Sequence, residues 1–240
     1  MSKLTLYSAG YSGTRLCRNG GSSFNSIEFD PSNIVFFTSG WKYNLFYTRN
    51  KQWYGCGDNE SGQIGCSSSE LSEITLVPEL LFTPIWAACG DKMTAIVNSQ
   101  GELFVSGSGY GNFKKPVPID KPIRFVACGT ERVVAIPHDT GIFCSDGGNN
   151  NFKYLAQDIT FVDCAAGQYH YLAISDKGVA YSWGRRKACG QGRKYNNQTP
   201  AVINVSEPVK FKRCFAYNIA SFLIDENNNI WSSGANNYGQ

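Results

Sequence analysis

The side chains best suited to binding a charged partner form two basic segments in the second half of the chain. Five basic residues stand within ten positions that hold no acidic residue: Arg185, Arg186, Lys187, Arg193 and Lys194. Three more follow in the next segment: Lys210, Lys212 and Arg213. Clustered lysine and arginine attract an acidic protein surface, DNA phosphate or anionic lipid. We predict that these eight residues bind a partner. A solvated polar loop is the alternative, because charge runs are commonly only solvated.

Acidic residues gather in the first half of the chain. They stand at Asp58, Glu60, Glu70, Glu73 and Glu79. The chain as a whole has a formal net charge of +3, so its total charge requires neither nucleic acid nor an acidic membrane as partner. The two halves nevertheless differ in sign, which favours docking of one partner in one orientation.

Side chains that could perform acid–base or metal chemistry are few. The two histidines, His138 and His170, have no matching cysteine or carboxylate spacing, so no metal site is predicted. His170 beside Tyr169 could exchange protons near neutral pH, but a structural, hydrogen-bonded histidine is the preferred interpretation. The glycine-rich segment 107–111 lacks the Lys-Ser/Thr pair and the helix of a phosphate loop, and we interpret it as a turn. We therefore predict no catalytic residue, no cofactor and no metal, and a protein that is not an enzyme.

The elements that position these side chains are recurring pairs of apolar segments. The clearest copy, residues 167–184, reads as glycine, apolar strand, polar turn, second apolar strand and closing glycine. Five full copies and one N-terminal half copy follow this pattern: 40–57, 90–107, 129–147, 167–184, 217–234 and 4–10. The opening anchor and the closing glycine are 17 residues apart in four copies and 18 in the third. Chance does not maintain such a spacing, and each copy predicts a β-hairpin.

A hairpin of this kind cannot bury both faces alone, so the copies must pack against one another. Radial packing of small sheets predicts a β-propeller. Between the hairpins lie segments such as 116–119 and 200–203, which contain proline and are followed by another apolar run. Because proline is confined to edge strands and strand starts, we predict outer strands and crossing loops there. We expect one all-β domain over residues 1–240, since all-β folds of this length are commonly single domains.

Four of the nine cysteines occupy related positions in the repeats. Cys89 and Cys128 precede their opening glycines by one residue, and Cys164 and Cys214 precede their anchors by three. Such positions share one face of a strand. No CxxC pair occurs. We predict small apolar packing near the propeller axis, with a redox sensor as the alternative.

The chain has no sequence signal for export or membrane insertion. Residues 1–10 contain one lysine and no apolar run of signal-peptide length. No later segment approaches the roughly 20 apolar residues that span a bilayer. We therefore expect a cytoplasmic protein without a transmembrane segment, with the nucleus as the alternative.

The repeats resemble those of the regulator of chromosome condensation family. The resemblance rests on a Cys-Gly or Ala-Gly step, an apolar strand, an Asp-x-Gly turn, a Tyr-Ser-Trp-Gly-like strand and Gly-Gln pairs at 62–63, 190–191 and 239–240. It covers the chain from Leu6 to Gln240 and implies an all-β propeller of that type. About five to six blades are recognisable. Because propellers of the family are typically seven-bladed, the comparison leaves open an incomplete ring.

The predicted function is a protein-binding scaffold. The alternative, implied by the resemblance, is guanine-nucleotide exchange on a Ran-like small GTPase, in which propeller loops would shift the GTPase toward a conformation that releases nucleotide. Chromatin binding is a third and weaker candidate, because the N-terminus lacks a basic tail, and nucleic acid is not the expected partner. The expected partner is another protein, with a small GTPase among the candidates, and self-association is expected if the ring is incomplete.

Overall fold

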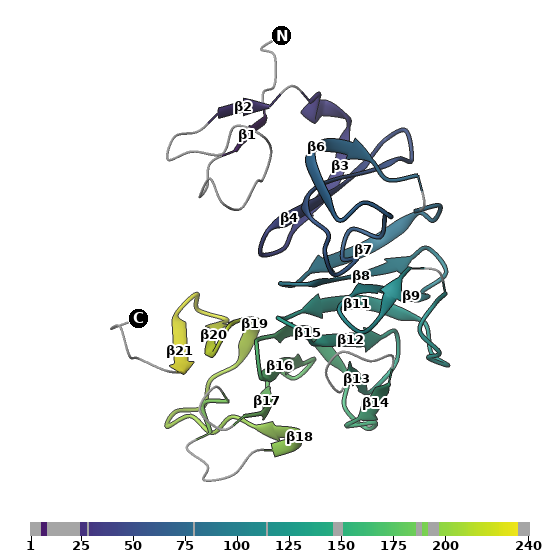
Figure 1. The fold of residues 1–240 in the computed structure, drawn as a ribbon. Helices are drawn as coiled ribbons and strands as arrows, with labels where there is room; N and C mark the ends of the chain where they lie inside the picture. Colours follow the sequence, from purple (N-terminus) through teal and green to yellow (C-terminus); the bar gives the residue numbers. More distant parts are fainter. Residues whose placement is uncertain are drawn as a thin grey trace.

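Short antiparallel β-sheets follow one another along the whole described chain (Figure 1). The computed structural model describes residues 6–8, 25–27, 29–78, 80–113, 115–145, 151–185, 189–191 and 197–234. Within these residues the helical structure is limited to one short 3-10 turn, Pro31–Asn33. None of it has the length and apolar character needed to cross a bilayer.

Five sheets of three or four strands correspond to the five full repeats, and a two-stranded sheet precedes them. Each sheet is a simple meander in which chain neighbours pair. The strands of the six sheets, sheet by sheet, are β1 (Leu6–Ser8) and β2 (Asn25–Ile27); β3 (Ile34–Ser39), β4 (Tyr43–Thr48), β5 (Trp53–Asp58) and β6 (Glu70–Leu76); β7 (Pro84–Cys89), β8 (Met93–Asn98), β9 (Leu103–Gly107) and β10 (Gly111–Asn112); β11 (Ile123–Cys128), β12 (Val133–Pro137), β13 (Ile142–Ser145) and β14 (Phe152–Leu155); β15 (Phe161–Ala166), β16 (His170–Ser175), β17 (Ala180–Gly184) and β18 (Asn197–Val202); β19 (Phe211–Tyr217), β20 (Ala220–Asp225) and β21 (Ile230–Gly234).

The sheets are arranged radially as the blades of a β-propeller (Figure 1). The first strands of consecutive blades contact one another, as in the pairs β3 with β7, β7 with β11, β11 with β15, and β15 with β19. The blades thus form an arc, with β1 and β2 near one end and β19 to β21 at the other (Figure 1). The all-β propeller expected from the repeats is confirmed.

The segments between the hairpins were predicted to be outer strands and crossing loops, and this prediction is correct only in part. Runs such as Asn197–Val202 are outer strands, as expected. The apolar runs that follow them are not, because each begins the next blade; Ile123–Cys128, for example, is β11. Sequence reasoning missed this because a strand beside the axis and an outer strand are both short apolar runs.

The closing glycines explain the fixed repeat spacing. Gly57, Gly107, Gly184 and Gly234 pair with the first residue of the second strand of their blade and have φ angles from 106° to 141°. A side chain there would be strained in φ and would overlap a backbone carbonyl oxygen of the same blade. The third closing glycine, Gly147, lies outside the described residues.

The opening glycines bring neighbouring blades into backbone contact. A Cβ atom added to Gly40, Gly90 or Gly129 would overlap the carbonyl oxygen of the opening glycine of the next blade, and one added to Gly167 would lie 2.8 Å from the carbonyl oxygen of Asn218. We call the end of the propeller that carries these glycines the glycine rim. The opposite end carries the hairpin turns, such as 98–101 and 175–178, and we call it the turn rim.

Apolar side chains fill the space between blades rather than within them. Val97 and Val105 of the second blade pack in one cluster with Val126 and Ala135 of the third. The other three clusters likewise join residues of two consecutive blades. Each blade therefore depends on its neighbours for its core, as in other repeat proteins.

Polar side chains also link consecutive blades at the glycine rim. The Tyr43 hydroxyl donates to the carbonyl oxygen of Met93 at 2.5 Å. His170 Nε2 and Ser221 Oγ form a hydrogen bond of 2.8 Å. The structural role expected for His170 is confirmed, and its bond joins the fourth blade to the fifth. Burial, with a smaller effect of the charge on Arg132, lowers the pKa of His170 to about 4.

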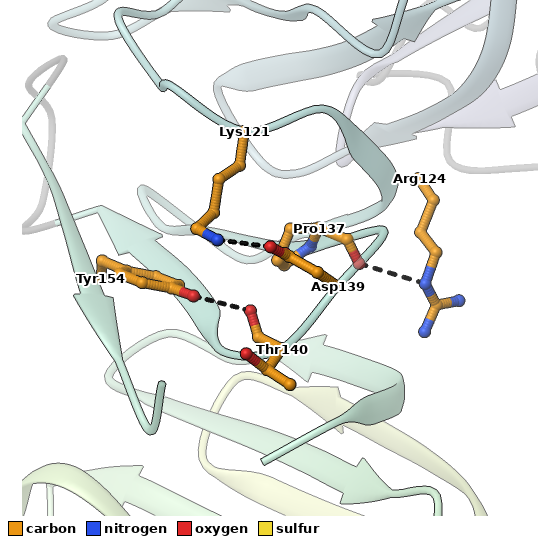
Figure 2. Close-up of polar contacts among 6 residues, drawn as sticks. All are labelled: Lys121, Arg124, Pro137, Asp139, Thr140 and Tyr154. Atoms are coloured by element: carbon orange, nitrogen blue, oxygen red, sulfur yellow. Dashed lines mark hydrogen bonds and ion pairs between the residues drawn. The ribbon is translucent and has the colours of Figure 1, made fainter. Parts of the chain in front are cut away.

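The turn rim of the third blade is held by a separate polar group, drawn in Figure 2. Lys121 pairs with Asp139, and the Tyr154 hydroxyl donates to the Thr140 carbonyl oxygen at 2.8 Å. Arg124 Nε donates to the carbonyl oxygen of Pro137 at 3.2 Å, and its Nη2 donates to that of Phe161 in the next blade. These contacts fix one hairpin turn and attach it to the fourth blade.

We expect Gly90→Ala to lower the free energy of unfolding by about 3 kcal/mol, because the new methyl group overlaps backbone that cannot move without separating two blades. The matched control is Gly111→Ala, where a Cβ atom meets open space and only the positive φ is unfavourable, at about 1 kcal/mol. Urea denaturation of both variants measures the difference. Equal losses would contradict the proposed backbone contact.

We expect stability to fall as the pH drops from 6.5 toward 4. The folded protein holds the pKa of His170 below that of the unfolded chain, so the unfolded state binds the proton first in this range. The full effect is about 3 kcal/mol. Denaturation across this range should show the fall in the wild-type protein and in His138→Gln, and a smaller fall in His170→Phe. The same slope in all three proteins would rule out His170 as its source.

Candidate partner-binding site

The structure separates the basic residues that the sequence grouped together. Arg185 lies at the glycine rim, where its backbone N–H donates to the carbonyl oxygen of Tyr169 at 2.9 Å. Lys210 and Lys212 lie at the turn rim, where Lys212 Nζ donates to Asn228 Oδ1 at 2.7 Å. Strand β19 runs between the two rims, a length of roughly 20 Å at about 3.3 Å per residue. Four of the predicted residues lie outside the described part of the chain: Arg186, Lys187, Arg193 and Lys194.

Arg213 is engaged near the propeller axis. Its Nε lies 3.2 Å from Oδ2 of Asp163, and the same oxygen accepts the backbone N–H of Cys214 at 2.8 Å. Burial raises the pKa of Asp163, while the N–H group and Arg213 oppose that rise. Sequence reasoning missed Asp163, although an acid within the apolar run 161–166 was a signal for a buried polar link. Asp163 joins the fourth and fifth blades.

The four repeat cysteines lie around the axis. Cys89, Cys128, Cys164 and Cys214 line a central cavity of about 260 Å³. Burial raises the pKa of each of these thiols. The thiolate is the reactive form, so these cysteines are poor nucleophiles at neutral pH. The predicted apolar packing near the axis is confirmed.

Two motifs considered in the sequence have structural roles. The glycine-rich segment 107–111 joins β9 to the short strand β10, which pairs back onto β9, and so forms a turn of the blade. In the second Gly-Gln pair, Gln191 Nε2 donates to the carbonyl oxygens of Ser182 and Ala201, both at 2.8 Å. The side chain thereby holds the third and fourth strands of its blade together.

A pocket at the glycine rim brings Arg185 together with two cations that the sequence did not identify. The pocket lies between the third and fourth blades and has a volume of about 180 Å³. Arg132 and Lys153 line it beside Arg185. We call it the rim pocket; its lining residues are Arg132, Cys144, Ser145, Lys153, Tyr169, Tyr171, Trp183, Gly184, Arg185, Asn197 and Gln198. None of these is acidic.

Aromatic rings hold both arginines of the rim pocket. The guanidinium carbon of Arg185 lies 4.0 Å from the centre of the Tyr169 ring, and that of Arg132 lies 5.5 Å from the Tyr171 ring. Arg132 Nε also donates to the carbonyl oxygen of Gln168 at 3.2 Å. Such contacts limit side-chain motion and leave other N–H groups able to bind a ligand.

The acidic residues predicted in the first half lie partly on the same rim. Asp58 is the last residue of β5 and lies opposite Glu70, the first residue of β6, in the strand register. The backbone N–H of Asp58, which follows the closing glycine Gly57, donates to the carbonyl oxygen of Lys42. Glu60 follows in the adjoining loop. Glu79 lies outside the described residues. The glycine rim thus carries Asp58 and Glu60 on the first blade, together with Lys42, and three cations between the third and fourth blades.

Metal chemistry finds no support among the described residues. They contain no group of three or more histidine, cysteine or acidic side chains arranged to hold a metal ion. The rim pocket is suited to binding an anionic group rather than to bond chemistry, because it combines cations and aromatic rings.

Comparison with known proteins identifies relatives built from the same repeat. No protein-family model matches the chain. An RCC1 repeat-containing protein of Dictyostelium discoideum is 22% identical over 287 residues, covering 90% of this chain and 58% of that protein. The regulator of chromosome condensation of Drosophila melanogaster is 24% identical over 223 residues, covering 87% and 36%. The human probable E3 ubiquitin-protein ligase HERC6 is 22% identical over 220 residues, covering 87% and 19%. The chain therefore spans less than two thirds of these relatives.

Solved structures share the fold at low identity. Human WBSCR16 superposes with a TM-score of 0.76 at 15% identity, covering 98% of this chain and 68% of that one. Yeast RCC1 (Prp20), solved bound to Kap60, gives 0.75 at 17% identity, covering 92% and 61%. Prp20p of Saccharomyces cerevisiae, studied with its binding to Gsp1p and histones, gives 0.69 at 17% identity, covering 89% and 59%.

The repeat hairpins, the radial blades and these named relatives agree. The chain is similar in sequence to proteins of the regulator of chromosome condensation repeat family and shares the propeller fold of their solved structures.

Proposed function

We propose that the chain is a protein-binding β-propeller scaffold that docks its partner on the glycine rim. The observation that carries this proposal is the rim pocket, where Arg132, Lys153 and Arg185 converge without an acidic neighbour in the lining. Rigid blades present Arg132 and Arg185 in loops next to strand ends, where binding residues are commonly found, and Lys153 on the outer strand β14. The acidic groups of the first blade on the same rim would orient the partner.

The relatives support a protein partner. Yeast Prp20 was solved bound to Kap60, and Prp20p was studied for its binding to Gsp1p and histones. These are properties of those proteins, which share this fold. The ligase HERC6 matches this chain over only 19% of its own length, so its activity is not carried over.

The proposed location of the protein is the cytoplasm, with the nucleus as the alternative.

Guanine-nucleotide exchange on a Ran-like small GTPase is the second candidate. The family resemblance supports it, and a propeller rim could act by binding the nucleotide-free conformation more tightly, which requires no catalytic residue. Chromatin binding is a third candidate, supported by the binding of Prp20p to histones. We rank both below the scaffold, because no described segment is identified with either activity.

We expect Arg185→Glu to reduce the retention of partner proteins about tenfold, because the change places an acid in a site that attracts acids. Affinity capture from cell extract, quantified by mass spectrometry, measures the retention. The matched control is Lys212→Glu, which makes the same charge change at the turn rim. Partners retained equally by both variants would place docking away from the glycine rim and contradict the proposal.

We expect no acceleration of nucleotide release when the chain is added at micromolar concentration to purified small GTPases, including a Ran-like one. A scaffold does not stabilise the nucleotide-free conformation, so it leaves the release rate unchanged. Release of a fluorescent nucleotide measures the rate. Acceleration that Arg185→Glu abolishes would instead establish exchange as the function.

A further inference from the structure

The rim pocket has the size of a side-chain site. Its volume of about 180 Å³ equals that of about six water molecules at roughly 30 Å³ each. Pockets for drug-sized ligands and cofactors are commonly about 300 to 1,000 Å³. The rim pocket is therefore of a size that suits one small group.

The electrostatic environment of the rim pocket favours a negative group. The lining holds three cations and no acid. The positive charge of Arg132 reaches the neighbouring groups. It adds to the effect of burial, which lowers the pKa of His170, and it opposes the larger effect of burial, which raises the pKa of Tyr171. An incoming anion meets the charges of Arg132 and Arg185, and no acidic side chain stands in the lining.

The lining also offers hydrogen-bond donors with fixed positions. Two guanidinium groups are held against Tyr169 and Tyr171, and arginine matches the planar geometry of a carboxylate. Trp183 forms part of the wall and is 2% exposed, and its Nε1–H has no acceptor among the described residues.

The aromatic lining distinguishes between anions. Tyr169, Tyr171 and Trp183 present apolar ring surface next to the cations. Aspartate and glutamate side chains combine a short methylene stem with a planar carboxylate, so both parts find a matching surface. A nucleic-acid strand would instead require cations along a row of phosphates.

We propose that the rim pocket binds the carboxylate of an aspartate or glutamate side chain in an acidic segment of a protein partner. Arg132 and Arg185 would pair with the carboxylate, and Lys153 would contribute charge at the edge. The inference rests on the proposed function, because it names the chemistry by which the scaffold recognises its partner.

The test uses the full chain and a fluorescein-labelled poly-glutamate peptide, with binding followed by fluorescence anisotropy. We expect saturable binding that a poly-glutamine peptide does not show. Arg185→Gln and Lys153→Gln should each weaken the affinity about tenfold, the loss of one charge-assisted contact. Both residues are exposed, so the variants should fold, and thermal unfolding checks this. Lys212→Gln, with the same charge loss at the turn rim, should bind as the wild-type protein does.

Each of the following results would overturn the inference. Equal weakening by Lys212→Gln would show general charge attraction. Tighter, Arg185-dependent binding of single-stranded DNA, or displacement of the peptide by equimolar inorganic phosphate, would identify a phosphate ligand. Absence of peptide binding, while captured partners still depend on Arg185, would refute the carboxylate but leave the scaffold function standing. Absence of both peptide binding and Arg185-dependent capture of partners would refute the scaffold function as well.

Discussion

The contact between the opening glycine of one blade and the backbone of the next sets the geometry of this propeller. At Gly40, Gly90 and Gly129 there is no room for a Cβ atom, because the carbonyl oxygen of the following opening glycine occupies the space. A side chain there would push neighbouring blades apart at the axis. The apolar clusters, each shared by two blades, would then lose contact along their whole length. Close packing of backbone at the centre is therefore a condition for the hydrophobic core farther out.

Buried hydrogen bonds also join consecutive blades and add directional constraints to the glycine contacts. Tyr43, His170 and Asp163 each reach from one blade to a partner in the next. These groups are buried, where an unmade hydrogen bond is costly, so each bond has a strong preference for one spacing between blades. Packing between blades could tolerate small slips, but directional bonds do not. The result is a scaffold on which side chains from different blades hold fixed relative positions.

The sequence determined the repeats more fully than the site. Glycine-bounded hairpins such as 90–107 could be predicted, because a positive φ and a backbone contact each demand glycine at a fixed place in every copy. The order of strands within a blade could not, since an axial strand such as β11 and an outer strand have the same apolar character. The residues of the rim pocket could not be predicted for another reason. Arg132 and Lys153 stand 53 and 32 positions before Arg185, and only the radial packing of blades brings the three together. Lys212 stands 27 positions after Arg185, a similar separation, but it lies near the opposite end of strand β19.

Charged side chains are arranged differently on the two rims, so the two faces of the propeller differ electrostatically. At the turn rim of the third blade, Lys121 is paired with Asp139. At the glycine rim, three cations meet in a lining without an acid, while the acidic residues Asp58 and Glu70 lie on the first blade. Paired charges have weak fields beyond their own neighbourhood, whereas separated charges on one surface act over about one Debye length, near 8 Å at physiological salt. A partner that carries acids at one end would therefore meet the glycine rim in one orientation. The blade connections place Arg132 and Arg185 on one rim, because the turn after an opening glycine and the loop after a closing glycine both emerge there.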